Sequence, residues 1–177
     1  PRDAEGALHD AALAMREAKR LGGGRCVVFQ PGTRDLALVA ARVEHELRDA
    51  VAAGELRVVY QPIVPLADGE PLGVEALVRW QHPQRGLVPP DEFIGIAESS
   101  GLIVPLGAFV LETACRQFVA WRRALGAHAP DKLSVNVSRG QFLEADFVED
   151  LLARAEAHGV APGRMVLEIT ESPIIAD

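Results

Sequence analysis

The sequence lacks an excess of basic residues, which excludes a general affinity for nucleic acid. It has 177 residues, with 18 Lys and Arg against 25 Asp and Glu, and a formal net charge of −7 at pH 7. Phosphate-driven binding of DNA or RNA needs a basic surface. Any anionic ligand must therefore be held by individual, locally placed cations, and we expect neither DNA nor RNA as a partner.

Long apolar runs and an N-terminal signal peptide are also absent. No uninterrupted run approaches the roughly 20 apolar residues of a membrane span, and the chain does not open on a signal peptide. We therefore expect this part of the protein to be cytoplasmic, whether or not the parent is anchored in a membrane. Because the chain begins with Pro1 rather than Met, we expect it to be a piece of a longer protein.

Cysteine is scarce, and glycine-rich phosphate loops are missing. Cys26 and Cys115 are far apart, each in an apolar setting, so buried free thiols in a reducing compartment are favoured over a disulfide. No Cys and His cluster has the spacing of a zinc site. Gly22-Gly23-Gly24 is not followed by Lys-Ser/Thr or by a helix, so we interpret it as a helix end.

The residues that are present have the composition of a core-forming domain, 49% hydrophobic and 24% charged. Their periodicity predicts alternating strands and helices. Strands are predicted at 26–29, 57–66, 72–80, 132–138 and 165–170, and helices at 5–21, 35–53, 90–100, 106–121 and 146–158. Helical crossovers indicate a parallel α/β sheet, while a turn at Asp68-Gly69 indicates that the strands on either side of it are antiparallel.

The predicted strand at 72–80 carries two charges in an apolar pattern. Alternation places Glu75, Leu77 and Arg79 on one face. An acid and a base four residues apart on a strand stand roughly 13 Å apart, so each needs its own partner in a water-poor site. The alternative is a solvated strand face with two ordinary charges.

Two later strands also carry an oxygen-bearing side chain in the middle of an apolar pattern. In a parallel sheet closed into a barrel, Glu75, Asn136 and Glu168 would converge near the carboxyl ends of the strands. Two carboxylates and an amide oxygen suit Mg²⁺, Mn²⁺ or Ca²⁺ and suit zinc poorly. The alternative is three unrelated polar residues at strand ends.

Four stretches resemble the EAL domain, in order and at the right separations. They are Tyr60-Gln61-Pro62-Ile63, Glu75-Ala76-Leu77-Val78-Arg79-Trp80, Asn136-Val137-Ser138 and Leu167-Glu168-Ile169-Thr170-Glu171-Ser172. The active members of this family are phosphodiesterases that linearise cyclic di-GMP to pGpG. The resemblance implies an α/β fold, the first half of a TIM-like (β/α)8 barrel with one antiparallel strand, truncated after about the fourth strand.

The same resemblance implies a site for two metal ions, Mg²⁺ or Mn²⁺. Glu75, Asn136 and Glu168 would be the ligands, and Glu75 and Glu168 would be the catalytic carboxylates. Glu171 would steady a loop beside the metals without binding them; the alternative is an ordinary solvated acid.

Substrate contacts are implied as well. Gln61 and Leu77 would line the substrate pocket, and Arg79 would meet a phosphate of cyclic di-GMP. His82 is interpreted only as part of the turn that follows the motif.

The first residues are similar to the closing helix and strand of a GGDEF (diguanylate cyclase) domain, through Asp10-Ala11-Ala12-Leu13-Ala14-Met15 and Glu17-Ala18-Lys19. This implies that residues 1–30 end a GGDEF-like domain, 31–34 are a linker, and 35–177 belong to the EAL domain. The signature motif of the cyclase itself is absent.

We therefore expect a fragment of a bacterial second-messenger protein, of the kind that regulates biofilms, with GGDEF and EAL domains in one parent chain that forms a homodimer. The parent would hydrolyse cyclic di-GMP; the alternative is a non-catalytic cyclic di-GMP receptor with an EAL fold. In the family an Asp-Asp-Phe-Gly stretch, a Lys, a Glu and a Gln follow, and none occurs here, so we expect this piece alone to be inactive.

Overall fold

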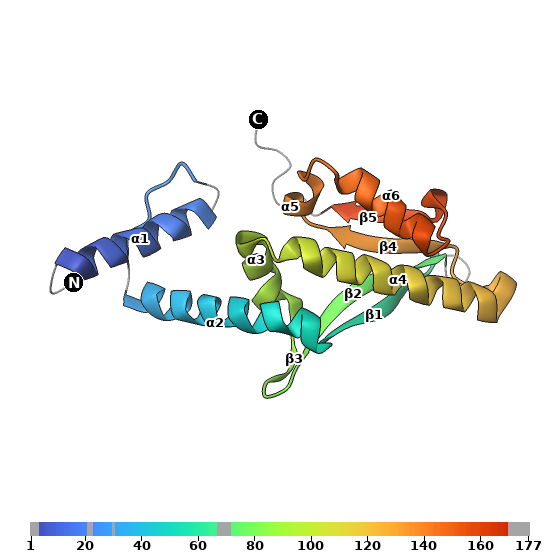
Figure 1. Ribbon diagram of the computed structural model, residues 1–177, viewed down its shortest axis with the longest axis horizontal. Coiled ribbons are helices and arrows are strands. Elements are labelled where there is room, and N and C mark those ends of the chain that lie inside the picture. The colour runs from blue at the N-terminus through green and yellow to red at the C-terminus, as the bar shows by residue number, and fades with distance from the viewer. Residues whose placement is uncertain (1–3, 21–22, 30, 67–71, 170–177) are drawn as a thin grey trace. The chain divides into compact units, whose positions relative to one another are not determined.

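The computed structural model describes residues 4–20, 23–29, 31–66 and 72–169 (Figure 1). The chain divides into two compact units, Pro1–Leu47 and Arg48–Asp177. The predicted turn at Asp68-Gly69 lies outside the described residues. The division at residue 47 falls inside a helix, so it differs from the predicted domain boundary at 31–34, which stays a prediction.

The first unit begins with helix α1 (Ala4–Arg20). The backbone N–H of Gly23 donates to the carbonyl of Ala18 (2.9 Å), and Gly23 has a left-handed φ of 72°, so the glycines follow the end of the helix as predicted. The predicted strand at 26–29 is wrong, because these residues have no regular structure. A strand needs a neighbour to pair its backbone groups, and the described part of this unit contains none.

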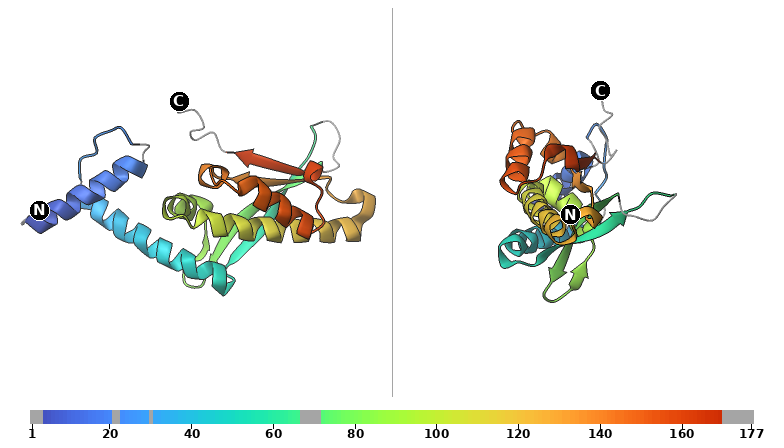
Figure 2. Two further views of the ribbon diagram at one scale, coloured as in Figure 1. Left: turned by 45° about the horizontal axis from the view of Figure 1, so that its top comes forward. Right: turned by 90° about the vertical axis from the view of Figure 1, so that its right-hand side faces the viewer.

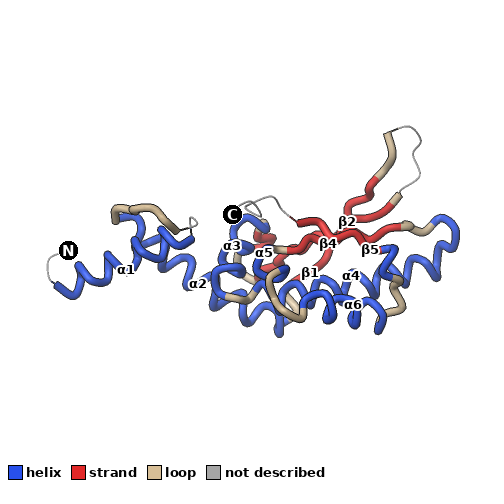
Figure 3. Tube along the Cα trace, turned by 90° about the horizontal axis from the view of Figure 1, so that it is seen from above, coloured by secondary structure: helices blue, strands red, loops and turns tan. Residues whose placement is uncertain are grey.

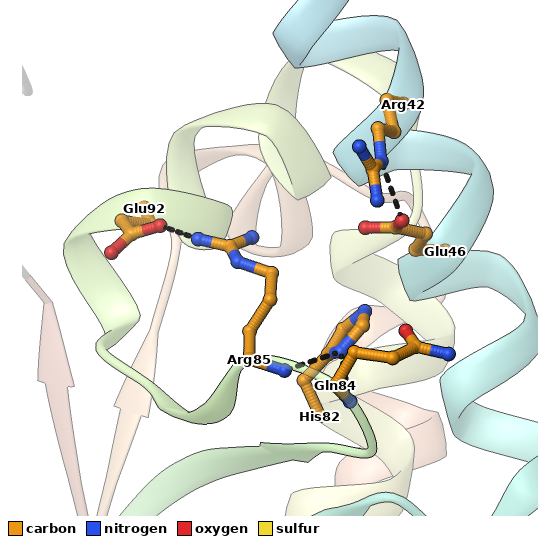
Figure 4. A network of polar contacts seen from close by, with 6 residues as sticks. All are labelled: Arg42, Glu46, His82, Gln84, Arg85 and Glu92. Atoms are coloured by element: carbon orange, nitrogen blue, oxygen red, sulfur yellow. Dashed lines mark hydrogen bonds and ion pairs between the residues drawn. The ribbon is translucent and has the colours of Figure 1, made fainter.

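Helix α2 (Pro31–Ala53) starts earlier than expected. The segment predicted as a linker forms its first turn, where a proline is tolerated because that N–H has no helical partner. One turn apart on this helix, Arg42 Nε donates to Glu46 Oε1 at 2.8 Å (Figure 4).

The second unit contains a five-stranded mixed sheet of β1 (Leu56–Ile63), β2 (Gly73–His82), β3 (Gly86–Val88), β4 (Lys132–Val137) and β5 (Met165–Ile169). The strand order is β1-β2-β4-β5, and β3 pairs with β2. The pair β1/β2 is antiparallel, whereas β2/β4 and β4/β5 are parallel. The predicted α/β class and the antiparallel pair are confirmed; closure into a barrel stays a prediction.

Helices connect and cover these strands. They are α3 (Pro90–Ser100), α4 (Ile103–Leu125), α5 (Arg139–Phe142) and α6 (Phe147–Ala157), with short 3-10 turns η1 (Gly126–His128) and η2 (Pro162–Arg164). As predicted, Gly101 ends α3, with a φ of 77° that favours glycine. Helices α4 and α6 lie together on one side of the sheet (Figure 2, Figure 3).

The hydrophobic core lies between the sheet and these two helices. Alternation turns Val74 and Ala76 of β2, and Leu133 and Val135 of β4, toward α4. The same cluster contains Val110, Leu111, Ala114, Cys115, Phe118, Leu151, Ala155 and Val160. Residues Ile103–His128 are long and apolar enough to cross a membrane by length and composition, but here the apolar face of α4 packs in this core, as a core helix does.

A second apolar contact holds the carboxyl end of β2. Trp80 is fully buried, and its indole Nε1 donates to Glu55 Oε2 at 3.0 Å. The ring of Phe93 from α3 lies edge-on at 5.7 Å between centroids. The indole therefore joins β2 to α3 by packing while its N–H is satisfied.

The hairpin from β2 to β3 is closed by His82, as the interpretation of this residue as part of the turn requires. Its Nδ1 accepts from the backbone N–H groups of Gln84 (3.1 Å) and Arg85 (3.2 Å) (Figure 4). The guanidinium of Arg85 pairs with Glu92 in the first turn of α3. The buried His82 thus acts as the acceptor that fixes this turn.

Both cysteines are free thiols, but only one is buried. Cys115 is fully buried in the core, whereas Cys26 is exposed, so the prediction of a buried Cys26 is wrong. The described part of the first unit contains no strand, so the sheet that was expected to cover Cys26 is not formed there.

The thiols should differ in reactivity. Burial raises the pKa of Cys115 to about 11, so at pH 8 very little reactive thiolate is present and the sulfur is out of reach. After a short pulse of iodoacetamide, peptide mapping should find Cys26 modified and Cys115 unmodified. In denaturant both should react. Equal labelling of the two thiols in the native protein would contradict the packing of α4.

Candidate functional site

The predicted site residues of β2 lie on the face of the sheet turned away from α4, called the open face below. Val74 and Ala76 point into the core, so Glu75, Leu77 and Arg79 point the other way. Glu75, Leu77 and Arg79 are all partly buried, which places them on a surface that is neither core nor fully solvated.

Strands β1, β4 and β5 add four further polar side chains to this face. Gln61 of β1 stands directly opposite Glu75, and Ser134 of β4 stands opposite Glu75 on the other side. Two residues beyond Ser134, Asn136 stands opposite Glu168 of β5. Because opposed residues on paired strands share a face, the sheet brings Gln61, Glu75, Asn136 and Glu168 together from four strands.

A hydrogen bond joins two of these side chains directly. Asn136 Nδ2 donates to Glu75 Oε1 at 2.7 Å. The amide nitrogen is therefore engaged with the carboxylate, while the amide oxygen and the other carboxylate oxygen keep their capacity to accept or to bind a cation. The bond holds the two groups in one relative orientation across the β2/β4 pair.

Arg79 lies further along β2, away from Glu75. Its Nη1 donates to the carbonyl of Val78 at 2.7 Å, and within the described residues it makes no ion pair. Directly opposite, on β1, stands Arg57, which likewise has no ion pair in the described part of the chain. Like charges directly opposite on paired strands disfavour each other, so an anion bound between these two guanidinium groups would be stabilising.

Sequence reasoning missed Arg57. The signal was available in part, because counting back from Gln61 in steps of two reaches Val59 and then Arg57 on the same face. The pairing of Arg57 with Arg79 could not be predicted from the sequence, because the register of two strands depends on the length of the turn between them. Val59 stands opposite Leu77, so an apolar strip separates the two arginines from Glu75.

The acids and the amide form an all-oxygen donor set. Glu75, Glu168 and Asn136 supply carboxylate and amide oxygens, the donors that hard cations such as Mg²⁺ and Mn²⁺ prefer. The described ranges contain no group of three or more His, Cys, Asp or Glu side chains placed to hold a metal, and the predicted set of two acids and one amide stays a prediction. Glu171 lies outside the described residues.

A pocket of about 420 Å³ lies behind the carboxyl end of β4, between α4, α5 and α6. Asn136 and Val137 line one wall, and Gly107 and Gln141 line another. The end of the strand that carries Asn136 therefore borders open space on this side.

Comparison with known proteins gives one consistent result. The EAL domain family matches residues 44–177. MucR of Pseudomonas aeruginosa, a bifunctional diguanylate cyclase/cyclic di-GMP phosphodiesterase, is 38% identical over 168 residues, which cover 95% of this chain and 24% of that protein. NbdA of the same organism, a cyclic di-GMP phosphodiesterase, is 36% identical over 168 residues, covering 95% of this chain and 21% of NbdA.

A solved structure of the MucR phosphodiesterase in complex with cyclic di-GMP is also similar. It has a TM-score of 0.69 and 40% sequence identity, and the match covers 73% of this chain and 52% of that chain. The present chain spans about a quarter of the length of the curated relatives that it matches.

Proposed function

The chain belongs to the EAL domain family, and on this premise we propose that the complete protein hydrolyses cyclic di-GMP to linear pGpG at the open face. The observation that supports this most is the 2.7 Å bond from Asn136 to Glu75, because it joins two oxygen-rich side chains of neighbouring strands beside Glu168. Two relatives that are more than a third identical, MucR and NbdA, are cyclic di-GMP phosphodiesterases.

In this proposal Glu75, Asn136 and Glu168 hold Mg²⁺ or Mn²⁺, and Glu75 and Glu168 are the catalytic carboxylates. Bound divalent ions supply an activated water and offset charge on the reacting phosphate. The protein's own contribution is orientation: Asn136 fixes Glu75 through one hydrogen bond and leaves its amide oxygen for the ion. Replacing either carboxylate, Glu75 or Glu168, is therefore expected to weaken metal binding.

The substrate phosphates would be met by Arg79, with Arg57 beside it. Guanidinium groups bind phosphate by two parallel hydrogen bonds, and two opposed arginines offset the charge of a dianion in a protein whose net charge is −7. Leu77, opposite Val59, offers an apolar surface to a guanine base, and the amide of Gln61 offers a donor and an acceptor to its edge.

We also infer the surroundings of this domain in the parent protein. The match to MucR covers 95% of the chain, so it includes residues before position 44, where the EAL match begins. This supports residues 1–30 as the end of a GGDEF-like domain in a GGDEF–EAL parent protein. We further propose that this part of the parent is cytoplasmic, whether or not the parent is anchored in a membrane, and that the parent is a homodimer. A tandem arrangement would place synthesis and hydrolysis of one messenger in one chain.

The direct test is incubation of the complete protein with cyclic di-GMP and Mg²⁺ or Mn²⁺, with separation of products by chromatography. We expect metal-dependent appearance of pGpG. Tight binding of cyclic di-GMP without any product would contradict hydrolysis and would indicate a receptor.

Glu75→Gln should abolish this hydrolysis. The substitution keeps the size of the side chain and an oxygen that accepts from Asn136, but it removes the anionic charge that a cation needs. The measurement is the initial rate of pGpG release in matched metal. Glu98→Gln, which changes an exposed acid of α3, is the control and should leave the rate unchanged. A Glu75→Gln rate within tenfold of wild type would refute the role of Glu75 as a ligand.

Arg79→Ala should weaken substrate binding and leave metal binding alone. The loss of a charge-assisted hydrogen bond to phosphate costs roughly 1.5–3 kcal/mol, and Arg79 stands well along the strand from the oxygen donors. Calorimetry with cyclic di-GMP, and separately with Mn²⁺, measures both effects. Arg123→Ala removes the same charge from α4 and should change neither. Unchanged nucleotide affinity, or lost Mn²⁺ affinity, would argue against this separation of roles.

A further inference from the structure

The chain leaves β4 through a reciprocal pair of hydrogen bonds at the start of α5. Ser138 Oγ accepts from the backbone N–H of Gln141, and Gln141 Oε1 accepts from the backbone N–H of Ser138, both at 3.2 Å. This capping box fixes the backbone two residues after Asn136.

The side chain of Gln141 also occupies a space on α4 that a larger residue would fill. A Cβ atom built on Gly107 would lie 1.8 Å from Gln141 Nε2 and 2.8 Å from its Cδ. Glycine inside a helix is less favourable than alanine by roughly 0.5–1 kcal/mol, and the φ of Gly107 is not positive. The close approach of Gln141 therefore explains why residue 107 is a glycine. The backbone conformation at 107 would also allow other residues.

Within the described residues, the end of β4 pairs with a neighbouring strand on one side only. Pairing of β2 with β4 ends at Ala76 and Val135, so Asn136 lies beyond the last paired residue on that side. On the helical side, Asn136 and Val137 border the pocket of about 420 Å³. Among the described strands, β5 alone continues to pair with this end.

We propose that Gly107 and Gln141 are positioning residues for the site on the open face. The contact between them, together with the capping box, holds the exit of β4 so that Asn136 reaches Glu75 and presents its amide oxygen to a cation. Neither residue touches the ligand. This inference rests on the proposed function, because it assumes that Glu75 and Asn136 bind a divalent ion.

A matched pair of glycine variants in the complete protein tests the contact. Gly107→Ala forces Gln141 out of place, whereas Gly95→Ala, inside α3, meets nothing within 4 Å. Residues that orient metal ligands typically contribute 10–100-fold in metal affinity. We therefore expect Gly107→Ala to weaken Mn²⁺ binding in calorimetry by at least about tenfold and Gly95→Ala to leave it within twofold.

A second pair of variants, at Gln141, separates an effect on ligand positioning from an effect on stability. It remains informative even if Gly107→Ala fails to fold. Gln141→Glu keeps a side-chain oxygen at the third helical position and so keeps the capping box. Gln141→Ala removes this oxygen and with it the bond to the backbone N–H of Ser138. We expect Mn²⁺ affinity close to wild type for Gln141→Glu and a loss similar to that of Gly107→Ala for Gln141→Ala. Melting temperatures measured in parallel identify any loss that follows from unfolding alone.

The outcomes distinguish the two proposals. If the wild-type protein binds no Mn²⁺ and releases no pGpG, the proposed function fails and the positioning role fails with it. If the wild type binds Mn²⁺ but Gln141→Ala binds it as well as Gln141→Glu does, the positioning role alone is refuted. A drop in melting temperature with unchanged Mn²⁺ affinity of the folded variants would also refute it.

Discussion

The pairing of β2 on both of its edges is the constraint on which the rest of the described second unit depends. Its first residues are hydrogen-bonded between β1 and β4, and its last residues pair with β3. A shift of register by one residue would turn Glu75 and Arg79 into the core and expose Ala76. Because an uncompensated buried charge is very unfavourable, the same alternation that builds the hydrophobic core also specifies which side chains form the site.

Much of the second unit could be predicted because its patterns are long. Apart from β3 and α5, which were not predicted, the strands and helices from residue 56 onward lie within a few residues of their predicted places. The shared face of Glu75, Leu77 and Arg79 follows from period-two alternation. The three-residue strand β3 is too short to show a period. The Asn136 to Glu75 bond and the opposition of Arg57 to Arg79 depend on register, which alternation within a single strand does not contain.

Charge is segregated along the open face. The acids and the amide lie where β2, β4 and β5 adjoin, and the two arginines lie further along the β1/β2 pair, beyond the apolar strip of Val59 and Leu77. A ligand with an anionic group and an apolar ring system would find these features in a fixed order along β2. An acidic protein can thus hold an anion by local placement, without a basic surface.

The mixed strand order has a consequence for how the molecule forms. Ile63 meets Gly73 after a loop of about ten residues, whereas Ala76 meets Val135 after about sixty. Loop-closure entropy makes the second encounter less favourable by about 1.6 kcal/mol, and it needs the whole crossover through α3 and α4. We therefore expect the β1/β2 hairpin to form first and β4 to join it later. Because Asn136 belongs to β4, we expect the geometry around Glu75 to be completed in this later step of folding.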